Sequence, residues 1–375
     1  MADRRPTEAT LPILTVNAGS STVKLSLIAK DDSVLGELEL AAPRSQIDPG
    51  DLGHAIQGEL SGADAVAHRI VHGGERYHAA VVIDRQVRRE IGALTDLAPL
   101  HQPKSLAALD AVSSQLPDVP AVACFDTAFH ATLAPEAFTY ALPAHWRERW
   151  GLRRFGFHGL SHSWVGRHTP EMLGNTDRTR RIVSCHLGAG ASLCAIADGR
   201  SVDTTMGFTP LEGLVMATRS GSVDPGLLLW LLEREAVDER QMASALEHES
   251  GLAGLTGDDD MRRVLDRAAT GDAEAALGIE VYLHRLRAAI AAMAASLGGV
   301  DVLVFTGGVG EHAPAIRSGA AGGLGFLGIV VDDAVNQSVG GDGEITAAGA
   351  PVRTLVLRAR EDLEMVRQTR RALGH

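Results

Sequence analysis

The sequence predicts an α/β protein of two domains that contain a duplicated β-motif. Three observations lead to this prediction: the length of the chain, a strand-and-turn pattern that occurs twice, and single apolar strands separated by helical segments. A chain of 375 residues exceeds the roughly 250–300 residues at which one hydrophobic core stops growing, so two domains are expected.

The first copy of the pattern lies near the N-terminus. Apolar or alternating runs are separated by short polar turns: the runs cover 11–16, 23–28 and 33–40, and the turns cover 17–21 and 31–32. Alternation with a period of two is typical of strands with one buried face. The first domain is therefore expected to open with a β-meander.

The same order of strand, glycine turn, strand, acidic turn and strand returns about 170 residues later. Its expected strands are 181–186, 192–197 and 201–204. Two unrelated hairpins are the alternative interpretation, because short β-patterns are common. The matching order and spacing favour a duplication.

Three further apolar runs end in glycine or in a polar residue. The run 65–71 ends at His72-Gly73-Gly74, 119–125 ends at Asp126-Thr127, and 301–305 ends at Thr306-Gly307-Gly308. Such runs are typical of buried strands with functional residues at their carboxyl ends. Helices are expected at 103–116, 226–235, 259–269, 273–297 and 361–373.

Composition restricts the class of partner. The formal net charge is −12, which argues against nucleic acid and anionic membranes because both bind concentrated basic surfaces. No stretch reaches the roughly 20 apolar residues of a membrane helix, and the N-terminus lacks the apolar core of a signal peptide. Cys124, Cys185 and Cys194 lie in apolar runs without metal-like spacing, which fits a reducing cytoplasm.

The two glycine turns are candidate phosphate sites. Backbone N–H groups of such turns can cradle phosphate, and hydroxyls at Ser20, Ser21 and Thr22 add donors beside Lys24. A plain hairpin is the alternative for either turn alone. Two turns in duplicated units favour a clamp that holds a polyphosphate from two sides.

One motif supports a competing hypothesis. The segment 308–313 matches G-x-G-x-x-A, the fingerprint of a nicotinamide dehydrogenase. Only 62 residues follow Ala313, too few for the rest of a dinucleotide domain. A glycine-rich turn that contacts an adenosine fits better.

Several polar residues could be functional or structural. The pairs His68/His72 and His158/His162 have i, i+4 spacing, but they lack the glutamate of a zinc motif and Gly159 should weaken a helix there. The run 153–159 indicates an ordered loop that touches an anion, and the long segment 206–225 is expected to be functional. Arg69 lies in an apolar strand and must meet a structural carboxylate or a substrate.

Taken together, nine ordered segments resemble the acetate kinase family, in the superfamily of acetate and sugar kinases, Hsp70 and actin. The resemblance covers nearly the whole chain, and its segments are 17–21, 68–74, 125–130, 155–159, 186–188, 206–214, 218–221, 260–262 and 305–308. It implies two duplicated βββαβαβα domains of the actin, Hsp70 and ribonuclease H-like type that close on a cleft. The expected domains are 1–130 with 363–375, which carries the phosphate and metal loop, and 131–362, which binds the nucleotide and forms a homodimer.

The resemblance also implies a reaction and a set of roles. The reaction is reversible transfer of a phosphoryl group between ATP and a short-chain carboxylate, with Mg²⁺ or Mn²⁺. Asn17 and Glu361 would hold the metal, Ser20, Thr22 and Lys24 would face phosphates, and catalysis would fall to Arg69, Asp126, His158 and Arg219. The acyl pocket would comprise Val71, Leu100, Phe157 and Pro210. The nucleotide would meet His186, Leu187, Gly188, Ala189, Gly190, Asp260, Met261, Arg262, Gly308, Val309, Gly310, Glu311 and His312.

The residue types suit this chemistry. A carboxylate is already ionised at neutral pH, so the nucleophile needs no general base but needs relief from charge repulsion. Asp126 is therefore expected to orient an arginine or a metal-bound water. Acetate is favoured over propionate because Val71 would narrow the pocket, and a propionate-preferring enzyme remains the alternative within the family.

Four positions depart from the family pattern: Leu160, Ala189, Ala217 and His312 stand where Thr, Asn, Gly and Asn are usual. These changes leave open a nucleotide-binding protein with weakened catalysis.

Overall fold

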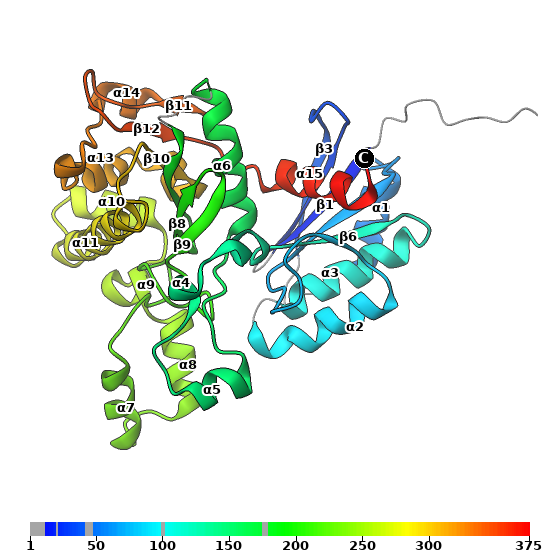
Figure 1. Ribbon diagram of the computed structural model, residues 1–375, viewed down its shortest axis with the longest axis horizontal. Coiled ribbons are helices and arrows are strands. Elements are labelled where there is room, and N and C mark those ends of the chain that lie inside the picture. The colour runs from blue at the N-terminus through cyan, green and yellow to red at the C-terminus, as the bar shows by residue number, and fades with distance from the viewer. Residues whose placement is uncertain (1–11, 20–21, 42–47, 99–101, 175–178) are drawn as a thin grey trace, which may run out of the picture. The chain divides into compact units, whose positions relative to one another are not determined.

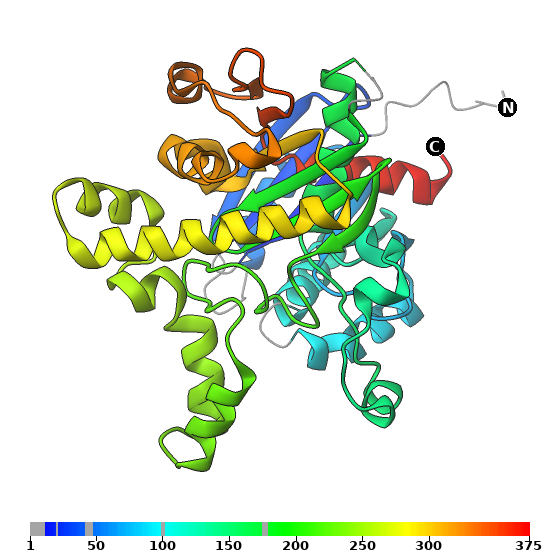
Figure 2. The ribbon, with the colours of Figure 1, turned by 60° about the vertical axis from the view of Figure 1, so that its left-hand side comes forward.

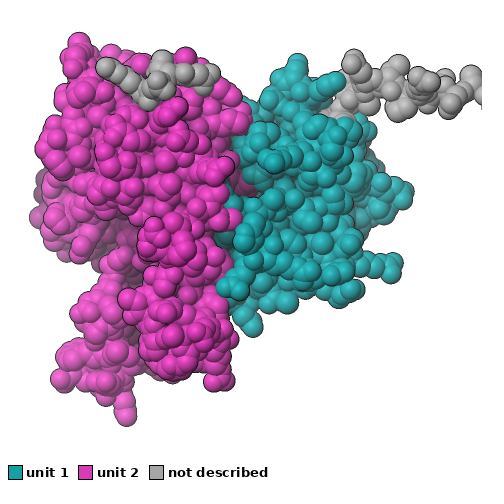
Figure 3. All heavy atoms as spheres, in the orientation of Figure 1, with its two compact units in different colours: residues 1–129, 360–375 teal, residues 130–359 magenta. Residues whose placement is uncertain are grey.

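The chain folds into two compact units. The computed structural model describes residues 12–19, 22–41, 48–98, 102–174 and 179–375. Unit 1 comprises residues 1–129 and 360–375, and unit 2 comprises residues 130–359 (Figure 3). The sequence analysis assigned residues 360–362 to the second domain, but they lie in unit 1 because Glu361 begins a helix that packs on the sheet of that unit.

Unit 1 is built on a mixed sheet of order β3-β2-β1-β4-β6-β5 (Figure 1). β1, β2 and β3 form an antiparallel meander, β4 and β6 continue it in parallel with β1, and β5 is antiparallel to β6. The parallel strands β1, β4 and β6 therefore have their carboxyl ends at one edge of the sheet. The strand bounds are β1 Ile13–Ala18, β2 Thr22–Ile28, β3 Val34–Ala41, β4 Ala65–Ile70, β5 Val81–Val82 and β6 Ala121–Phe125.

Helices cover both faces of this sheet. Helices α1 (Pro49–Gln57) and α3 (Gln102–Gln115) bury Leu52 and Val112 against strand residues such as Val66. Helix α15 (Glu361–Leu373) packs on β1, β4 and β6, where Cys124 lies 3.7 Å from the Met365 carbonyl oxygen. The sequence analysis did not identify α1 or α2 (Arg85–Ala93), because each has only nine residues and its main signal is a capping aspartate.

Unit 2 repeats the topology of unit 1. Its sheet has the order β11-β12-β10-β7-β8-β9, so a meander is again followed by two parallel strands and an antiparallel edge strand. The predicted α/β class and the duplication are confirmed. The strand bounds are β7 Arg181–Leu187, β8 Ala191–Ala197, β9 Arg200–Thr204, β10 Val302–Thr306, β11 Gly343–Glu344 and β12 Arg353–Val356.

Two long helices lie against the sheet of unit 2. Helix α11 (Ala273–Ser296) crosses β7, β8 and β9, as Figure 2 shows in yellow over green strands. Helix α6 (Gly159–Met172) packs on β7 through His162, which contacts Ser184. Because Ser184 and Cys185 alternate on β7 and Tyr282 of α11 interacts with Cys185, the two helices lie on opposite faces.

The start of α6 corrects one expectation. Gly159 was expected to weaken a helix, but it is the first helical residue, where the cost of an interior glycine does not apply. His158 precedes it with a left-handed φ of 54°, an unusual conformation for a residue other than glycine. The remaining helices of unit 2 are α4 Pro135–Phe138, α5 Ala144–Trp150, α7 Pro225–Glu233, α8 Glu239–His248, α9 Gly251–Thr256, α10 Met261–Ala269, α12 Gly307–His312, α13 Pro314–Gly322 and α14 Asp333–Ser338.

The described helices include none with the length and apolar character needed to cross a bilayer. The three cysteines are buried and unbridged.

Candidate active site

In unit 1, four polar side chains meet at the carboxyl edge of the sheet. Arg69, near the end of β4, forms a fork with Asp126, which follows β6: Nη2 lies 2.7 Å from Oδ2 and Nε lies 3.1 Å from Oδ1. Arg69 Nη1 also donates to Asn17 Oδ1 at 3.0 Å, and Asn17 Nδ2 donates to Glu361 Oε2 at 3.0 Å. The ends of the parallel strands and the start of α15 thus bring residues that are far apart in sequence into contact.

This cluster is largely shielded from solvent. The side chain of Asp126 is 1% exposed and that of Arg69 is 18% exposed. Burial lowers the pKa of Arg69, but the Asp126 and Glu361 carboxylates outweigh burial and raise it above its ordinary value. Burial raises the pKa of Asp126, and Arg69 opposes that shift. Arg69 therefore stays cationic. Of the two partners that the sequence analysis left open for Arg69, a structural carboxylate or a substrate, the structure shows a structural carboxylate, Asp126.

The cluster also bears on metal binding. Among the residues that the structure describes, no group of three or more His, Cys, Asp or Glu side chains is arranged to hold a metal ion. Magnesium bound with a nucleotide commonly uses only one or two protein oxygen ligands, together with phosphate and water. The oxygens of Asn17 and Glu361 fit that donor set.

The glycine turn between β1 and β2 is described only in part. Lys24 pairs with Asn17 across β1 and β2, and its ammonium lies 3.9 Å from Glu39 with the side chain 60% exposed. The Gly19 N–H donates to the Thr22 carbonyl at 2.8 Å, which closes the turn. Ser20 and Ser21 lie outside the described residues.

In unit 2, three histidines and three serines form a connected group. The rings of His158 and His186 stack with centroids 4.3 Å apart. Serine hydroxyls contact the Nδ1 atom of each ring: Ser192 at 2.9 Å from His158 and Ser161 at 2.8 Å from His186. His162 lies behind them, fully buried, and burial together with the neighbouring His130 and His186 holds its pKa well below the ordinary range.

Arg219 lies beside this histidine group. Its Nη1 donates to the Pro210 carbonyl at 2.7 Å, and burial lowers its pKa against the opposing charge of Glu247. Gly190 occupies the space between Arg219 and His158: a Cβ there would lie 2.7 Å from Arg219 Nη2 and 3.3 Å from His158 Nε2. A guanidinium and an imidazole thus converge at Gly190, where an added side chain would displace the end of Arg219.

The long loop 205–222 that carries Arg219 is held by groups that the sequence analysis missed. Glu212 accepts from Arg154 at 2.8 Å and from the Tyr140 hydroxyl at 2.6 Å. Arg154 also donates to the carbonyls of Thr205 and Met206. The run 153–159 was expected to touch an anion, and for Arg154 this anion is Glu212. The guanidinium carbon of Arg153 instead lies over the Phe138 ring, 3.9 Å from the ring centroid.

A pocket of about 430 Å³ lies in unit 2. It brings together eight of the predicted nucleotide-binding residues: Gly188, Ala189, Asp260, Met261, Arg262, Gly308, Val309 and His312. Its lining also includes Ala217, Leu252, Asp259, Leu265, Tyr282 and Ala313. The sequence analysis did not identify Leu252, Leu265 or Tyr282, because a pocket wall and a core position have the same apolar pattern.

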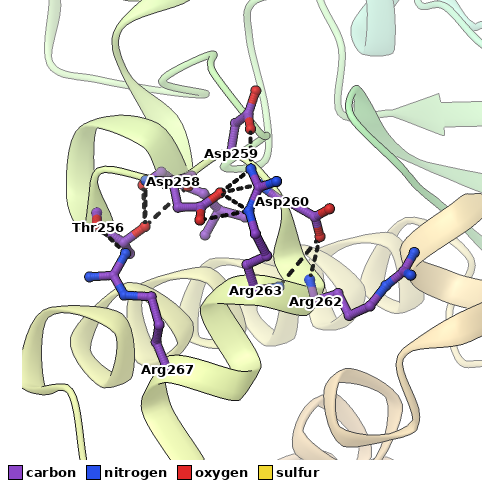
Figure 4. Close-up of polar contacts among 8 residues, drawn as sticks. Thr256, Asp258, Asp259, Asp260, Arg262, Arg263 and Arg267 are labelled. Carbon is purple, nitrogen blue, oxygen red and sulfur yellow. Dashed lines mark hydrogen bonds and ion pairs between the residues drawn. The ribbon is translucent and has the colours of Figure 1, made fainter.

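The polar side of this pocket is built by a turn of aspartates before α10. Asp258 forms a fork with Arg263, with Oδ1 2.6 Å from Nη2, and Asp260 caps α10 by accepting from the Arg262 N–H at 2.8 Å (Figure 4). The Arg262 guanidinium points away from this cluster (Figure 4). The turn is therefore rigid, while the Arg262 side chain takes no part in holding it.

Other predicted site residues have structural contacts or are not brought together. Glu311 is not among the residues that line the pocket, and it accepts from the N–H groups of Gly307 and Ala359 at 3.0 and 2.9 Å. Gly310 packs on Phe305, and Leu187 is buried in β7. Val71 lies in unit 1, whereas Phe157 and Pro210 lie in unit 2, and Leu100 lies outside the described residues. The acyl pocket stays a prediction.

Two units of identical sheet topology, with arginine, carboxylate and histidine groups at strand ends, define a two-domain phosphotransferase of the α/β class. The Acetokinase family model matches residues 50–367. The chain belongs to the Acetokinase family.

Individual relatives agree with this assignment. An acetate kinase of Trichormus variabilis is 46% identical over 314 residues, which cover 84% of this chain and 77% of the relative. The crystal structure of Porphyromonas gingivalis acetate kinase has a TM-score of 0.88 and 33% identity, covering 97% of this chain and 100% of that chain. The crystal structure of a propionate kinase from Francisella tularensis has a TM-score of 0.88 and 31% identity, covering 96% of this chain and 98% of that chain.

The dehydrogenase hypothesis is wrong. The sheet that precedes Gly308 is mixed and repeats the topology of unit 1, and residues 308–312 of the G-x-G-x-x-A segment lie in the short helix α12, with Ala313 as its C-cap. The family match assigns the chain to the kinases.

Proposed function

We propose that this protein catalyses the reversible transfer of the γ-phosphoryl group of ATP to acetate, giving acetyl phosphate and ADP. The observation that carries the proposal is the family membership combined with the buried Arg69–Asp126–Asn17–Glu361 cluster. Because acetate is ionised at neutral pH, the protein has to neutralise charge rather than remove a proton.

In this proposal the cluster of unit 1 prepares one cation and one metal site. Asp126 fixes the guanidinium of Arg69, which binds the acetate carboxylate. Asn17 and Glu361 supply the oxygens for Mg²⁺, which when bound neutralises charge on the nucleotide phosphates. Lys24, exposed on β2, faces the phosphates.

The groups of unit 2 act on the phosphoryl being transferred. Arg219, held by the Pro210 carbonyl, and His158 stabilise the charge that spreads over its equatorial oxygens, and His186 is the third donor. Arg69 of unit 1 and Arg219 of unit 2 are therefore both assigned a role in the proposed reaction.

The nucleotide occupies the pocket next to α10 and α12. Leu252, Met261 and Val309 offer apolar contact to a base, while Asp260 and Arg262 offer polar contact to the sugar or base. Ala189 and Ala217 line the same pocket: Ala189 is smaller than the usual Asn and leaves more room, whereas Ala217 adds a methyl group where Gly is usual.

The substrate preference follows from the acyl pocket. Val71 is 9% exposed at the end of β4 and Phe157 is 1% exposed, so both are held rigidly. One additional methylene changes binding by about 1–3 kcal/mol. We expect acetate to have a higher kcat/KM than propionate.

The active form is proposed to be a homodimer in the cytoplasm. None of the nine residues of α7 is buried, and Leu227, Leu229 and Trp230 are 48%, 59% and 49% exposed. Apolar side chains in such an arrangement are typical of an interface. Substitution of Leu229 by Glu should lower the mass measured by sedimentation, whereas an unchanged dimer mass would exclude this face.

The direct test of activity is acyl phosphate formation with ATP, Mg²⁺ and acetate, trapped as the hydroxamate. Arg219→Ala should lower kcat by about 10³-fold or more. Arg240→Ala, which changes an exposed arginine of α8, should leave the rate unchanged. Parent-like turnover in Arg219→Ala would refute the assignment, and ATP binding without any acyl phosphate would favour a nucleotide-binding protein without catalysis.

A further inference from the structure

Behind His158, a row of hydrogen-bonding groups runs into the core of unit 2. Ser192 Oγ, on β8, lies 2.9 Å from His158 Nδ1 and 2.8 Å from His162 Nε2. Ser184 Oγ, on β7, lies 2.9 Å from His162 Nδ1. Ser184, Ser192 and His162 are each fully buried, so the row ends inside the protein.

Each serine has one hydroxyl proton, and a neutral imidazole has one N–H. If Ser192 donates to His158 Nδ1, it must accept from His162 Nε2–H, and His162 Nδ1 must then accept from Ser184. All three contacts are satisfied in this direction, and His158 presents its own N–H at Nε2. That atom is the one that Gly190 leaves space for, beside Arg219.

The opposite direction keeps the same three contacts but turns Ser184 from a donor into an acceptor. When His158 carries a second proton, its Nδ1–H donates to Ser192. Ser192 then donates to His162 Nε2, and His162 holds its proton on Nδ1 and donates to Ser184. The three hydrogen bonds persist with donor and acceptor exchanged: His158 gains one proton from solvent, His162 and the two serines each keep one, and the buried Ser184 hydroxyl proton gives up its acceptor on His162.

We propose that Ser192 and His162 are positioning residues for the phosphoryl-transfer reaction: the row Ser184–His162–Ser192 holds His158 as an Nε2–H donor and reverses its direction when His158 is protonated. The effect on catalysis rests on the proposed function, whereas the hydrogen-bond row itself does not depend on it. His162 acts by changing tautomer without changing charge.

The surroundings fit this role. His162 is faced by the rings of His130 and His186, with centroids 5.8 and 6.4 Å away, and His158 is faced by His186 and by the Arg219 guanidinium. No described acidic side chain contacts His162, and burial, together with His130 and His186, lowers the pKa of His162. A buried imidazole that stays neutral is suited to switching between tautomers.

Nitrogen-15 NMR of the whole protein labelled at histidine tests the geometry without substrates. At neutral pH, His158 and His162 should both be Nε2–H tautomers, with signals assigned by single histidine substitutions. As His158 titrates, His162 should change to the Nδ1–H tautomer without becoming charged. A His162 ring that keeps one tautomer throughout the titration of His158 would overturn the proposal.

Kinetics test the consequence, with a matched control. Ser192→Ala should lower kcat by about 10- to 100-fold, with a smaller change in the KM for acetate, and Ser184→Ala should lower it less. Ser201→Ala is the control, because Ser201 is a buried serine on β9 that contacts a different histidine, His130, at 2.8 Å. Equal kcat values for Ser192→Ala and Ser201→Ala would contradict the role.

The two proposals can be separated. A parent protein without acetate-dependent turnover would remove the proposed function and leave the NMR result standing.

The titration midpoint of His158 should also shift to lower pH in Ser192→Ala, because the Nδ1–H of His158 loses the acceptor that stabilises the protonated ring.

Discussion

Acid should destabilise unit 1 through one buried histidine, His68 on β4. Its side chain is 1% exposed, and neither ring nitrogen has a hydrogen-bond partner among the residues that the structure describes. Burial lowers its pKa to about 4, with Asp110 opposing the shift. The unfolded chain, with a histidine pKa of about 6.5, therefore binds more protons than the folded chain between these two values.

The sign and size of the effect follow from this difference. The contribution of His68 is complete above pH 6.5 and is lost as the pH falls toward 4. The full difference corresponds to about 3 kcal/mol, of which about 2 kcal/mol is lost between pH 7.5 and pH 5. Leucine has a volume similar to that of histidine but does not titrate, so His68→Leu should remove this loss of unfolding free energy between pH 7.5 and pH 5. At pH 7.5 the unfolding free energy of unit 1 should stay equal or rise, because two buried ring nitrogens without partners are removed.

Native-state amide hydrogen exchange of peptides from β1, β4 and β6 measures this at pH 5 and pH 7.5. Tryptophan fluorescence is not suitable, since all four tryptophans lie in unit 2. His54→Leu, at an exposed position of α1, is the control and should keep the pH dependence of the parent. An equally steep loss of stability in His68→Leu would refute the reasoning.

Three further outcomes are expected. Asp126→Asn should cost unit 1 about 3–5 kcal/mol of unfolding free energy in hydrogen exchange, because Arg69 stays charged and half-buried without its carboxylate. Ala217→Leu should raise the KM for ATP by about 10-fold in steady-state assays while the KM for acetate stays constant, since Ala217 lines the pocket. Gly207→Ala should destabilise unit 2 by about 3 kcal/mol in urea unfolding followed by tryptophan fluorescence, because its Cβ would overlap the Glu212 carboxylate and the Tyr140 hydroxyl.

Controls separate these effects from general damage. Asp32→Asn removes an exposed partner of Arg370 and should cost under about 1 kcal/mol. Ala236→Leu, at an exposed position, should leave the KM for ATP unchanged. Gly322→Ala should be tolerated because no atom lies within 4 Å of the added Cβ. A loss in any control as large as in its matched variant would contradict the specific explanation.

Much of the fold could be predicted from local pattern. Alternation identified the meanders, and apolar runs ending in glycine or aspartate identified β4, β6 and β10 with polar residues after them. These signals are local because strand pleat and turn chemistry depend on neighbouring residues. Helix α6 was missed, because its glycine start, histidines and internal proline oppose its helical pattern and only packing on β7 stabilises it.

The sequence predicted which residue types form the candidate site, but it predicted only some of the contacts between them. Arg69 was expected to need an anion, but Asp126 is 57 positions away and Asn17 is 344 positions from Glu361. No periodicity relates residues at such separations. The same holds for Glu212, whose contacts with Arg154 and Tyr140 hold the loop 205–222.

The sequence by itself determined the two meanders and strands β4, β6 and β10, but not β5, β11 or β12. It also determined that the meander occurs twice and that arginine, histidine and carboxylate groups stand near strand ends. The tertiary structure alone decided that Arg69 is held by Asp126, that serine hydroxyls contact the Nδ1 atoms of His158 and His186, and that residues from six segments enclose one pocket. The reason is physical: backbone pattern is set by neighbours in sequence, whereas buried charges and hydrogen bonds find their partners only when distant segments pack together.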